Sequence, residues 1–293
     1  MTRLERRYRA MLRFYPADYR DAHGDELLDV LLETAEPGRT LPAARECAGL
    51  VVGGVQARVR ANTRTNPWWD GLHLGLTAIM VAQAAAFLPY TGSVPIWTAL
   101  SLAALLAVLR GHHLIALPLV ALTGVKAFTI SDGQQFFELT LLPVYPDLLT
   151  DQPLFRSTTP FAVSATYVLV AVGLIALASR RAGHVRSGWW LALAPALAWM
   201  GPEWMDRDLG YPLSLSRLIL EAALLGAGVW AGYLARDPRW ALGGALYLVA
   251  VSTEMAQHLS DLTGQHLGYW GLLGFMTFAA AAVPYRQRRH ALD

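Results

Sequence analysis

The sequence predicts an all-α protein: a polytopic membrane helix bundle of about eight spans behind a small N-terminal cytoplasmic helical domain. Hydrophobic residues make up 54% of the chain and charged residues only 16%, whereas soluble domains carry about 25% charged residues. Charge is concentrated in residues 1–66, which hold 11 Arg and 9 Asp or Glu, and long apolar segments follow. We therefore divide the chain into a cytoplasmic head (1–66), a transmembrane domain (67–285) and a cytoplasmic tail (286–293).

The head is expected to form three helices. Apolar residues recur at helical spacing in the first, which ends before Pro16 because proline lacks a backbone N–H group. The second is expected over Asp18–Glu33, with Leu27, Leu28 and Leu31 on one face, and Pro37 and Gly38 after it. The third is expected from about Leu41 to Arg60, and its predicted apolar face consists of Ala44, Ala48, Val51, Val55 and Val59.

The head also carries a family resemblance. The run from Tyr8 to Pro16, then Tyr19-Arg20, then the segment Gly24 to Leu28, resembles a small cytoplasmic module of actinobacterial membrane proteins, of the permease-prefix and anti-sigma-like signalling type. The resemblance covers roughly residues 4–60. Genes for such proteins often lie beside PadR-type transcription regulators, so it implies a signalling role and a PadR-like cytoplasmic partner. The residues assigned to that contact are Tyr8, Leu12, Tyr15, Glu26 and Leu27.

The transmembrane domain is predicted from apolar length, since a bilayer crossing needs about 20 residues. The expected spans are Gly71–Leu88, Val94–Leu109, Leu114–Ile130, Phe161–Ala178, Trp189–Gly201, Leu218–Leu234, Trp240–His258 and Tyr269–Val283. Prolines interrupt the fifth. Two Trp pairs, Trp68-Trp69 and Trp189-Trp190, each precede four of these segments. That spacing fits either a four-plus-four repeat or the ordinary preference of Trp for membrane interfaces.

Arginine placement predicts the orientation, because cytoplasmic loops are enriched in Lys and Arg. With the head inside, the inner loops and tail hold nine Arg and the outer loops three. Charge runs through residues 1–40, which is unlike a cleavable signal peptide. We expect a multi-pass cell-membrane protein with both termini in the cytoplasm and in contact with membrane lipids. The net charge of only +2 predicts no direct nucleic-acid partner.

Ionisable residues inside spans cost several kcal/mol unless paired or hydrated, so they are candidate functional residues. The predicted ligand-binding group, all near the outer face, is Lys126, Glu203, Glu221, Glu254, Gln257, His258 and Asp261. The last four follow helical spacing and are expected to share one helix face. Because neither Lys126 nor Glu254 has a local partner of opposite sign, we expect these two to pair.

Structural roles compete with ligand binding at the same positions. Glu221 lies four residues after Arg217, a spacing that favours a local ion pair. Lys126 can extend its ammonium to the outer interface, and Glu254 and His258 can hydrogen-bond neighbouring helices. The segment Ser131–Thr159 is apolar for a loop, and it is expected to form a short helix on the outer interface, as a lid or as a simple connector.

Nothing in the sequence predicts catalysis or a cofactor. Nucleophile-elbow, phosphate-loop, dinucleotide and kinase patterns are absent. The spacing of Glu254 and His258, with Asp261 or His266 nearby, fits zinc only weakly, so no metal is predicted. The favoured function is a membrane sensor or regulatory protein whose head binds a cytoplasmic regulator. The alternative is a transporter or permease component for a small or lipophilic molecule. The sequence predicts no oligomeric state.

Overall fold

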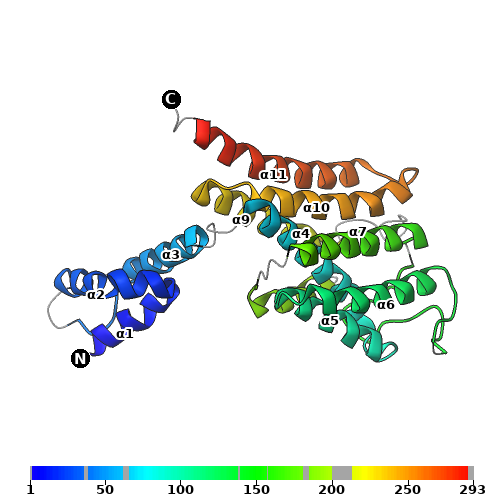
Figure 1. Cartoon of the computed structure of the whole chain (residues 1–293), viewed down its shortest axis with the longest axis horizontal. Coiled ribbons are helices and arrows are strands. Elements are labelled where there is room, and N and C mark those ends of the chain that lie inside the picture. The colour runs from blue at the N-terminus through cyan, green and yellow to red at the C-terminus, as the bar shows by residue number, and fades with distance from the viewer. Residues whose placement is uncertain are drawn as a thin grey trace.

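The computed structural model describes residues 2–35, 39–61, 66–137, 139–156, 158–180, 185–199 and 213–289. These residues form a helical head at one end of a larger helical bundle (Figure 1). The N-terminus and the C-terminal end of the last helix both lie toward the head end of the bundle, and the long loop after α6 lies at the opposite end (Figure 1). We call these the inner and outer ends.

The three predicted head helices are confirmed. They are α1 (Arg3–Met11), extended by a 3-10 turn η1 (Leu12–Phe14), then α2 (Ala17–Glu33), then α3 (Ala44–Ala61). Pro16 stands between the first two, as predicted, and the expected stop at Pro37 and Gly38 lies outside the described residues. The small apolar core consists of Leu4, Tyr8, Leu12, Leu28 and Leu50.

The predicted apolar face of the third helix is wrong. Leu50 and Gly54 face the head core, whereas Ala44, Ala48 and Val55 are exposed. The reason is a close backbone approach, since a Cβ atom on Gly54 would lie 2.8 Å from the Phe14 Cβ and 2.9 Å from the Phe14 carbonyl oxygen. Glycine, the residue with least hydrophobic surface, therefore marks the contact face.

The head core also changes the predicted partner contacts. Tyr8 and Leu12 are buried at 0% and 5% exposure, so neither side chain is available to a partner. Tyr15 and Leu27 are half-buried, and Glu26 is exposed. The Tyr8 hydroxyl donates to the Glu46 carboxylate at 2.5 Å. Burial, together with that hydrogen bond, raises the pKa of Tyr8 to about 12, and the same bond lowers the pKa of Glu46.

The bundle contains the helices at all eight predicted positions. They are α4 (Pro67–Phe87) with η3 (Leu88–Tyr90), α5 (Pro95–Leu109), α6 (His113–Ser131), α7 (Pro160–Ser179), η4 (Gly188–Ala192) with α8 (Leu193–Ala198), α9 (Leu215–Ala235), α10 (Arg239–Met255) with η5 (Ala256–His258), and α11 (Gly264–Arg289).

Five of these helical segments are long and apolar enough to cross a membrane: Pro67–Tyr90, His113–Ser131, Pro160–Ser179, Leu215–Ala235 and Gly264–Gln287. Helix α5 has 15 residues and α10 has 17. The fifth predicted segment has only the 11 helical residues of η4 and α8, about 20 Å at the usual rise per residue, against about 30 Å of hydrocarbon. Its predicted end at Gly201 lies outside the described residues.

Two apolar cores hold the bundle together. The larger joins α4, α5, α6, α7 and α8, and the smaller joins α9, α10 and α11. Helix α10 connects them, because it packs against α4 and α7 on one side and against α9 and α11 on the other. Glycines bring α4 and α10 close together: a Cβ atom on Gly71 would lie 2.7 Å from the Arg239 carbonyl oxygen. This approach brings the inner ends of the two helices within side-chain reach.

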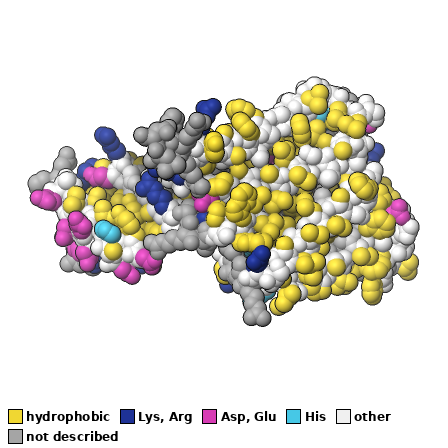
Figure 2. All heavy atoms as spheres, turned by 45° about the horizontal axis from the view of Figure 1, so that its top comes forward, with side chains coloured by type: hydrophobic (Ala, Val, Ile, Leu, Met, Phe, Trp, Pro, Cys, Tyr) yellow, Lys and Arg dark blue, Asp and Glu magenta, His cyan; other side chains and the backbone are white. Residues whose placement is uncertain are grey.

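The bundle surface is apolar. Figure 2 shows hydrophobic side chains spread over the visible face of the bundle, while Asp and Glu side chains gather on the head. Exposed large residues project from the long helices, among them Leu114 on α6, Phe161 on α7, Ile219 on α9 and Phe275 on α11. An apolar exterior of this extent is the surface of a membrane protein.

The Gly54 contact predicts the effect of a single methyl group on the head. Gly54→Ala should destabilise the head by about 1–3 kcal/mol through overpacking. Gly49→Ala, on the open side of the same helix with no atom within 4 Å of its Cβ position, should be neutral or stabilising by up to ~1 kcal/mol. The measurement is the thiol-labelling rate of Cys47, the single cysteine, in the full-length protein. Equal labelling rates in the two variants would contradict the close approach.

Candidate functional site

The loop between α6 and α7 forms a cap over the outer end of the bundle. The short interfacial helix predicted here is wrong, because residues 132–137, 139–156 and 158–159 contain no helix. Pro143, Pro146 and Pro153 interrupt any helical run. Side-chain and backbone hydrogen bonds to the bundle fix the loop instead. We call residues 132–156 the outer cap.

Lys126 is the first anchor of the outer cap. Lys126 is 1% exposed, and its ammonium donates to the Phe136 carbonyl at 3.1 Å and to the Thr140 hydroxyl at 2.7 Å. It also lies 5.3 Å from the centroid of the Trp97 ring, within range of a cation–π interaction. Lys126 therefore does not extend to the interface. It holds the start of the cap against α5 and α6.

The outer end of α4 is the second anchor. The Asp147 backbone N–H donates to the Pro89 carbonyl at 2.8 Å, and the Asp147 carboxylate accepts from the Gly92 N–H at 2.6 Å. The Tyr90 hydroxyl donates to the Gln152 carbonyl at 2.5 Å. These bonds join the middle of the cap to the 3-10 turn η3, which directly follows α4, and to the residue Gly92 after it.

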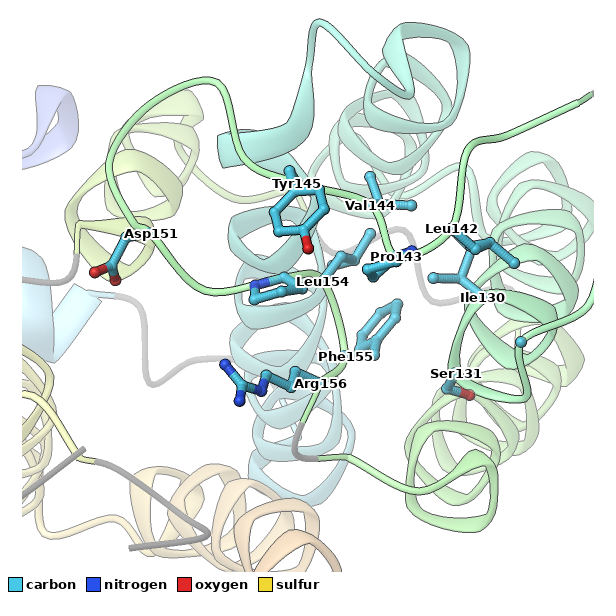
Figure 3. A pocket seen from close by; sticks show the side chains of 12 residues that line it. Ile130, Ser131, Leu142, Pro143, Val144, Tyr145, Asp151, Leu154, Phe155 and Arg156 are labelled. Atoms are coloured by element: carbon cyan, nitrogen blue, oxygen red, sulfur yellow. The ribbon is translucent and has the colours of Figure 1, made fainter. Parts of the chain in front are cut away.

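A pocket of about 640 Å³, open to the surface on one side, lies between the outer cap and the end of α6; we call it the outer cavity. Its wall is apolar, formed by Ile130 of α6 and by Leu142, Pro143, Leu154 and Phe155 of the cap. Figure 3 shows the Asp151 carboxylate and the Arg156 guanidinium on one side, with the Tyr145 hydroxyl pointing into the space between them and the apolar wall. An apolar wall with a few polar groups suits a small amphiphilic molecule.

A buried ionic cluster joins α9, α10 and α11 near their outer ends. The Glu221 carboxylate is 2% exposed and accepts from Arg217 Nε at 2.9 Å. It also accepts from the hydroxyls of Tyr247, at 2.5 Å, and Tyr269. Arg217 reaches Glu254 at 3.4 Å. The predicted ion pair between Arg217 and Glu221 is confirmed.

The predicted pair between Lys126 and Glu254 is wrong. Glu254 pairs with Arg217, while Lys126 is held by the outer cap. The structure thus separates the predicted ligand-binding group into different sites. The expected common face of Glu254, Gln257, His258 and Asp261 is also interrupted, because α10 ends at Met255 and continues as a 3-10 turn.

The remaining members of that group lie at the outer surface. The Gln257 side chain accepts from the Thr159 N–H at 2.6 Å and thereby ties the end of α10 to the start of α7. The His258 carbonyl accepts from the Asp261 N–H in the turn that leads to α11. Glu203 lies outside the described residues. None of these contacts by itself forms a ligand site.

The sequence analysis missed a second ionic cluster at the inner end, which we call the inner latch. The Asp70 carboxylate accepts from Arg186 at 2.6 Å and from Arg239 at 2.7 Å. Arg239 is 2% exposed and also pairs with Asp237 at 3.1 Å. The Arg186 backbone N–H donates to the Leu109 carbonyl at 2.8 Å. The latch therefore ties α4, α5, α10 and the segment before η4 together.

His73 completes the inner latch. Its side chain is fully buried, and Nδ1 accepts from Arg186 Nε at 2.8 Å. Because arginine can only donate, Nε2 of a neutral His73 carries the proton and donates to the Val108 carbonyl at 3.0 Å. The signal for this site was an Asp and a His one turn apart on the same face at the start of a span.

Metal and family comparisons add no assignment. Within the described part of the chain, no group of three or more His, Cys, Asp and Glu side chains is placed to hold a metal ion. Comparison of the chain with family models, with curated proteins and with solved structures finds no match.

The outer cluster predicts which substitutions are energetically coupled. Arg217→Met and Glu221→Gln should couple by about 0.5–3 kcal/mol, because they share a buried contact. Lys126→Met and Glu254→Gln should instead add within about 0.5 kcal/mol. Two double-mutant cycles on thermal unfolding in detergent measure both quantities. A coupling between Lys126 and Glu254 as large as that between Arg217 and Glu221 would contradict the observed partners.

The inner latch predicts a large cost for removing its central charge. Asp70→Asn leaves the buried Arg239, which keeps only its pair with Asp237, beside the partly buried Arg186, and it should destabilise the bundle by at most about 3–5 kcal/mol. Adding Arg239→Met removes one of those cations, so the double variant should lose less than the sum of the two single variants. Asp132→Asn, an exposed carboxylate, is the matched control. Thermal unfolding of the purified protein is the measurement, and a strictly additive double variant would exclude the latch.

Proposed function

We propose that this protein is an integral membrane sensor or regulatory protein of the cell membrane, with about eight spans and both termini in the cytoplasm. The cavity under the outer cap receives a small amphiphilic molecule from the outer side. The head binds a cytoplasmic regulator, of which a PadR-like transcription regulator is the type that the head's resemblance suggests. The transmembrane domain carries the signal between them.

The observation that supports this proposal most directly is the connectivity of α4. Its outer end carries hydrogen bonds to the cap at Pro89 and Tyr90. Its inner end carries Asp70 and His73 of the latch. Only residues 62–66 separate it from α3 of the head. A shift of the cap on ligand binding therefore acts on the one helix that is joined directly to the head.

The inner latch gives this helix two discrete arrangements. With Asp70 paired to both arginines, the start of α4 is held against α10 and the segment before η4. With those pairs separated, the start of α4 is free to move and the head moves with it. A ligand that favours one arrangement shifts the equilibrium by its difference in affinity for the two.

The direction of the helices supports the proposed topology. Asp70, Arg186 and Arg239 meet at the inner end, whereas Gln257 and Thr159 meet at the outer end. The residues that begin α4 and α10 thus lie on the side of the head, and the residue before α7 lies on the other side. This alternation agrees with the arginine-rich inner loops and with a head in the cytoplasm.

The experiment compares transcript profiles of host cells that carry the full-length protein, a variant lacking residues 2–61, and Lys126→Met, which releases the cap. Asp132→Asn, in the same loop, is the control. We expect head deletion and cap release to change an overlapping set of transcripts, and the control to change none. The transporter alternative expects solute flux into proteoliposomes that survives head deletion. Such flux, with unchanged transcripts, would overturn the sensor proposal.

A further inference from the structure

The charges of the head are separated by helix. Five exposed arginines lie on α1 and η1 with a single acid, Glu5: Arg3, Arg6, Arg7, Arg9 and Arg13. Six exposed acids lie on α2 with a single arginine, Arg20: Asp18, Asp21, Asp25, Glu26, Asp29 and Glu33. The head therefore has a basic side and an acidic side. Figure 2 shows acidic side chains at the end of the head away from the bundle and basic side chains nearer to it.

One edge of the basic side lies close to the bundle. It is formed where η1 packs on α3, and Arg58 donates to the Arg13 carbonyl at 2.6 Å. Phe14 is 43% exposed on this edge, with its backbone against Gly54. Helix α3 in turn packs against α9 of the bundle. We call Arg13, Phe14 and Arg58 the basic edge.

The inner end of the bundle has the composition of a membrane interface. Trp68 and Trp189 are 65% and 81% exposed there. The Arg180 guanidinium lies 5.3 Å from the centroid of the Trp69 ring. Tryptophan and arginine are the residues that sit at headgroup level on the cytoplasmic side. The head lies at this same end of the bundle (Figure 1). We call Trp68, Trp69, Arg180 and Trp189 the interfacial belt.

We propose that the basic edge binds the anionic headgroups of the inner leaflet, with Phe14 inserted among them. The occupant is the lipid surface of the protein's own membrane, because the edge combines positive charge with an exposed aromatic ring and belongs to a head that lies at the same end of the bundle as the interfacial belt. This contact turns the acidic helix α2 toward the cytosol. The proposed lipid contact does not depend on whether the outer cavity binds a molecule.

The experiment places an environment-sensitive fluorophore on Phe14→Cys in a Cys47→Ser background. The full chain is reconstituted in nanodiscs of phosphatidylcholine, with or without phosphatidylglycerol. We expect a blue-shifted emission, quenched by headgroup-spin-labelled lipid, only in the anionic nanodiscs. Salt at ~1 M, where the Debye length is about 3 Å, should reverse both signals.

A matched pair of charge reversals tests the position of the contact. Each basic residue near an anionic surface contributes about a fivefold factor, so Arg13→Glu should lower the ratio of bound to released head about 30-fold. Arg3→Glu makes the same charge change about 15 Å away along α1, and it should change the ratio only a few-fold. Neither side chain has a described hydrogen bond whose loss would unfold the head.

Three results would overturn the proposal. The first is identical emission in zwitterionic and anionic nanodiscs. The second is a blue shift that ~1 M salt does not reverse, since the label would then be buried against the chain itself rather than against charged lipid. The third is an equal effect of Arg3→Glu and Arg13→Glu, which would indicate attraction by the net charge of the head without a defined contact.

Discussion

The bundle depends on one partly buried carboxylate, Asp70, which lies between two arginines. Each arginine would be costly to bury alone, and Asp70 with Asp237 balances both charges within the described cluster. The arrangement fixes the start of α4 against α10 and against the segment that carries Arg186. It requires the glycines that let α4 and α10 approach, since a side chain at Gly71 would collide with the Arg239 carbonyl. At the inner end, the close packing of α4 on α10 and the ion pair between Asp70 and Arg239 therefore depend on each other.

At the outer end of the bundle, the loop is held in place by hydrogen bonds to its backbone, and not mainly by ion pairs. The outer cap has no helix in its described residues, and polar groups of the helices form hydrogen bonds with its backbone. The Lys126 ammonium donates to the Phe136 carbonyl, and the Tyr90 hydroxyl donates to the Gln152 carbonyl. The Pro89 carbonyl accepts from the Asp147 N–H. Irregular backbone needs such partners wherever it is shielded from water. The cavity beneath the cap exists because these anchors hold the loop above the helix ends. The anchoring side chains are thus positioning residues for any molecule that binds there.

The head and the bundle are joined through α3 and α4, which follow each other in sequence, and α3 also packs against α9. Charge is separated within the head: basic side chains lie nearer to the bundle, and the acids of α2 lie at the end away from it (Figure 2). The head therefore has two chemically different surfaces, a basic one and an acidic one. The buried tyrosine–carboxylate pair of Tyr8 and Glu46 keeps its three helices together.

The sequence by itself determined the helices, the division into head and bundle, and the local ion pair of Arg217 with Glu221, because apolar periodicity, prolines and i,i+4 spacing act over a few residues. Only the tertiary structure decided which distant charges meet. Asp70 pairs with arginines that lie 116 and 169 positions away in the sequence, and a pattern over a few residues cannot predict a pair at such a separation. Lys126 donates to a carbonyl and a hydroxyl of the outer cap, and it does not pair with Glu254 as expected. The buried positions of Tyr8 and Leu12 likewise follow from how three short helices pack, which depends on Gly54 and not on residue type alone.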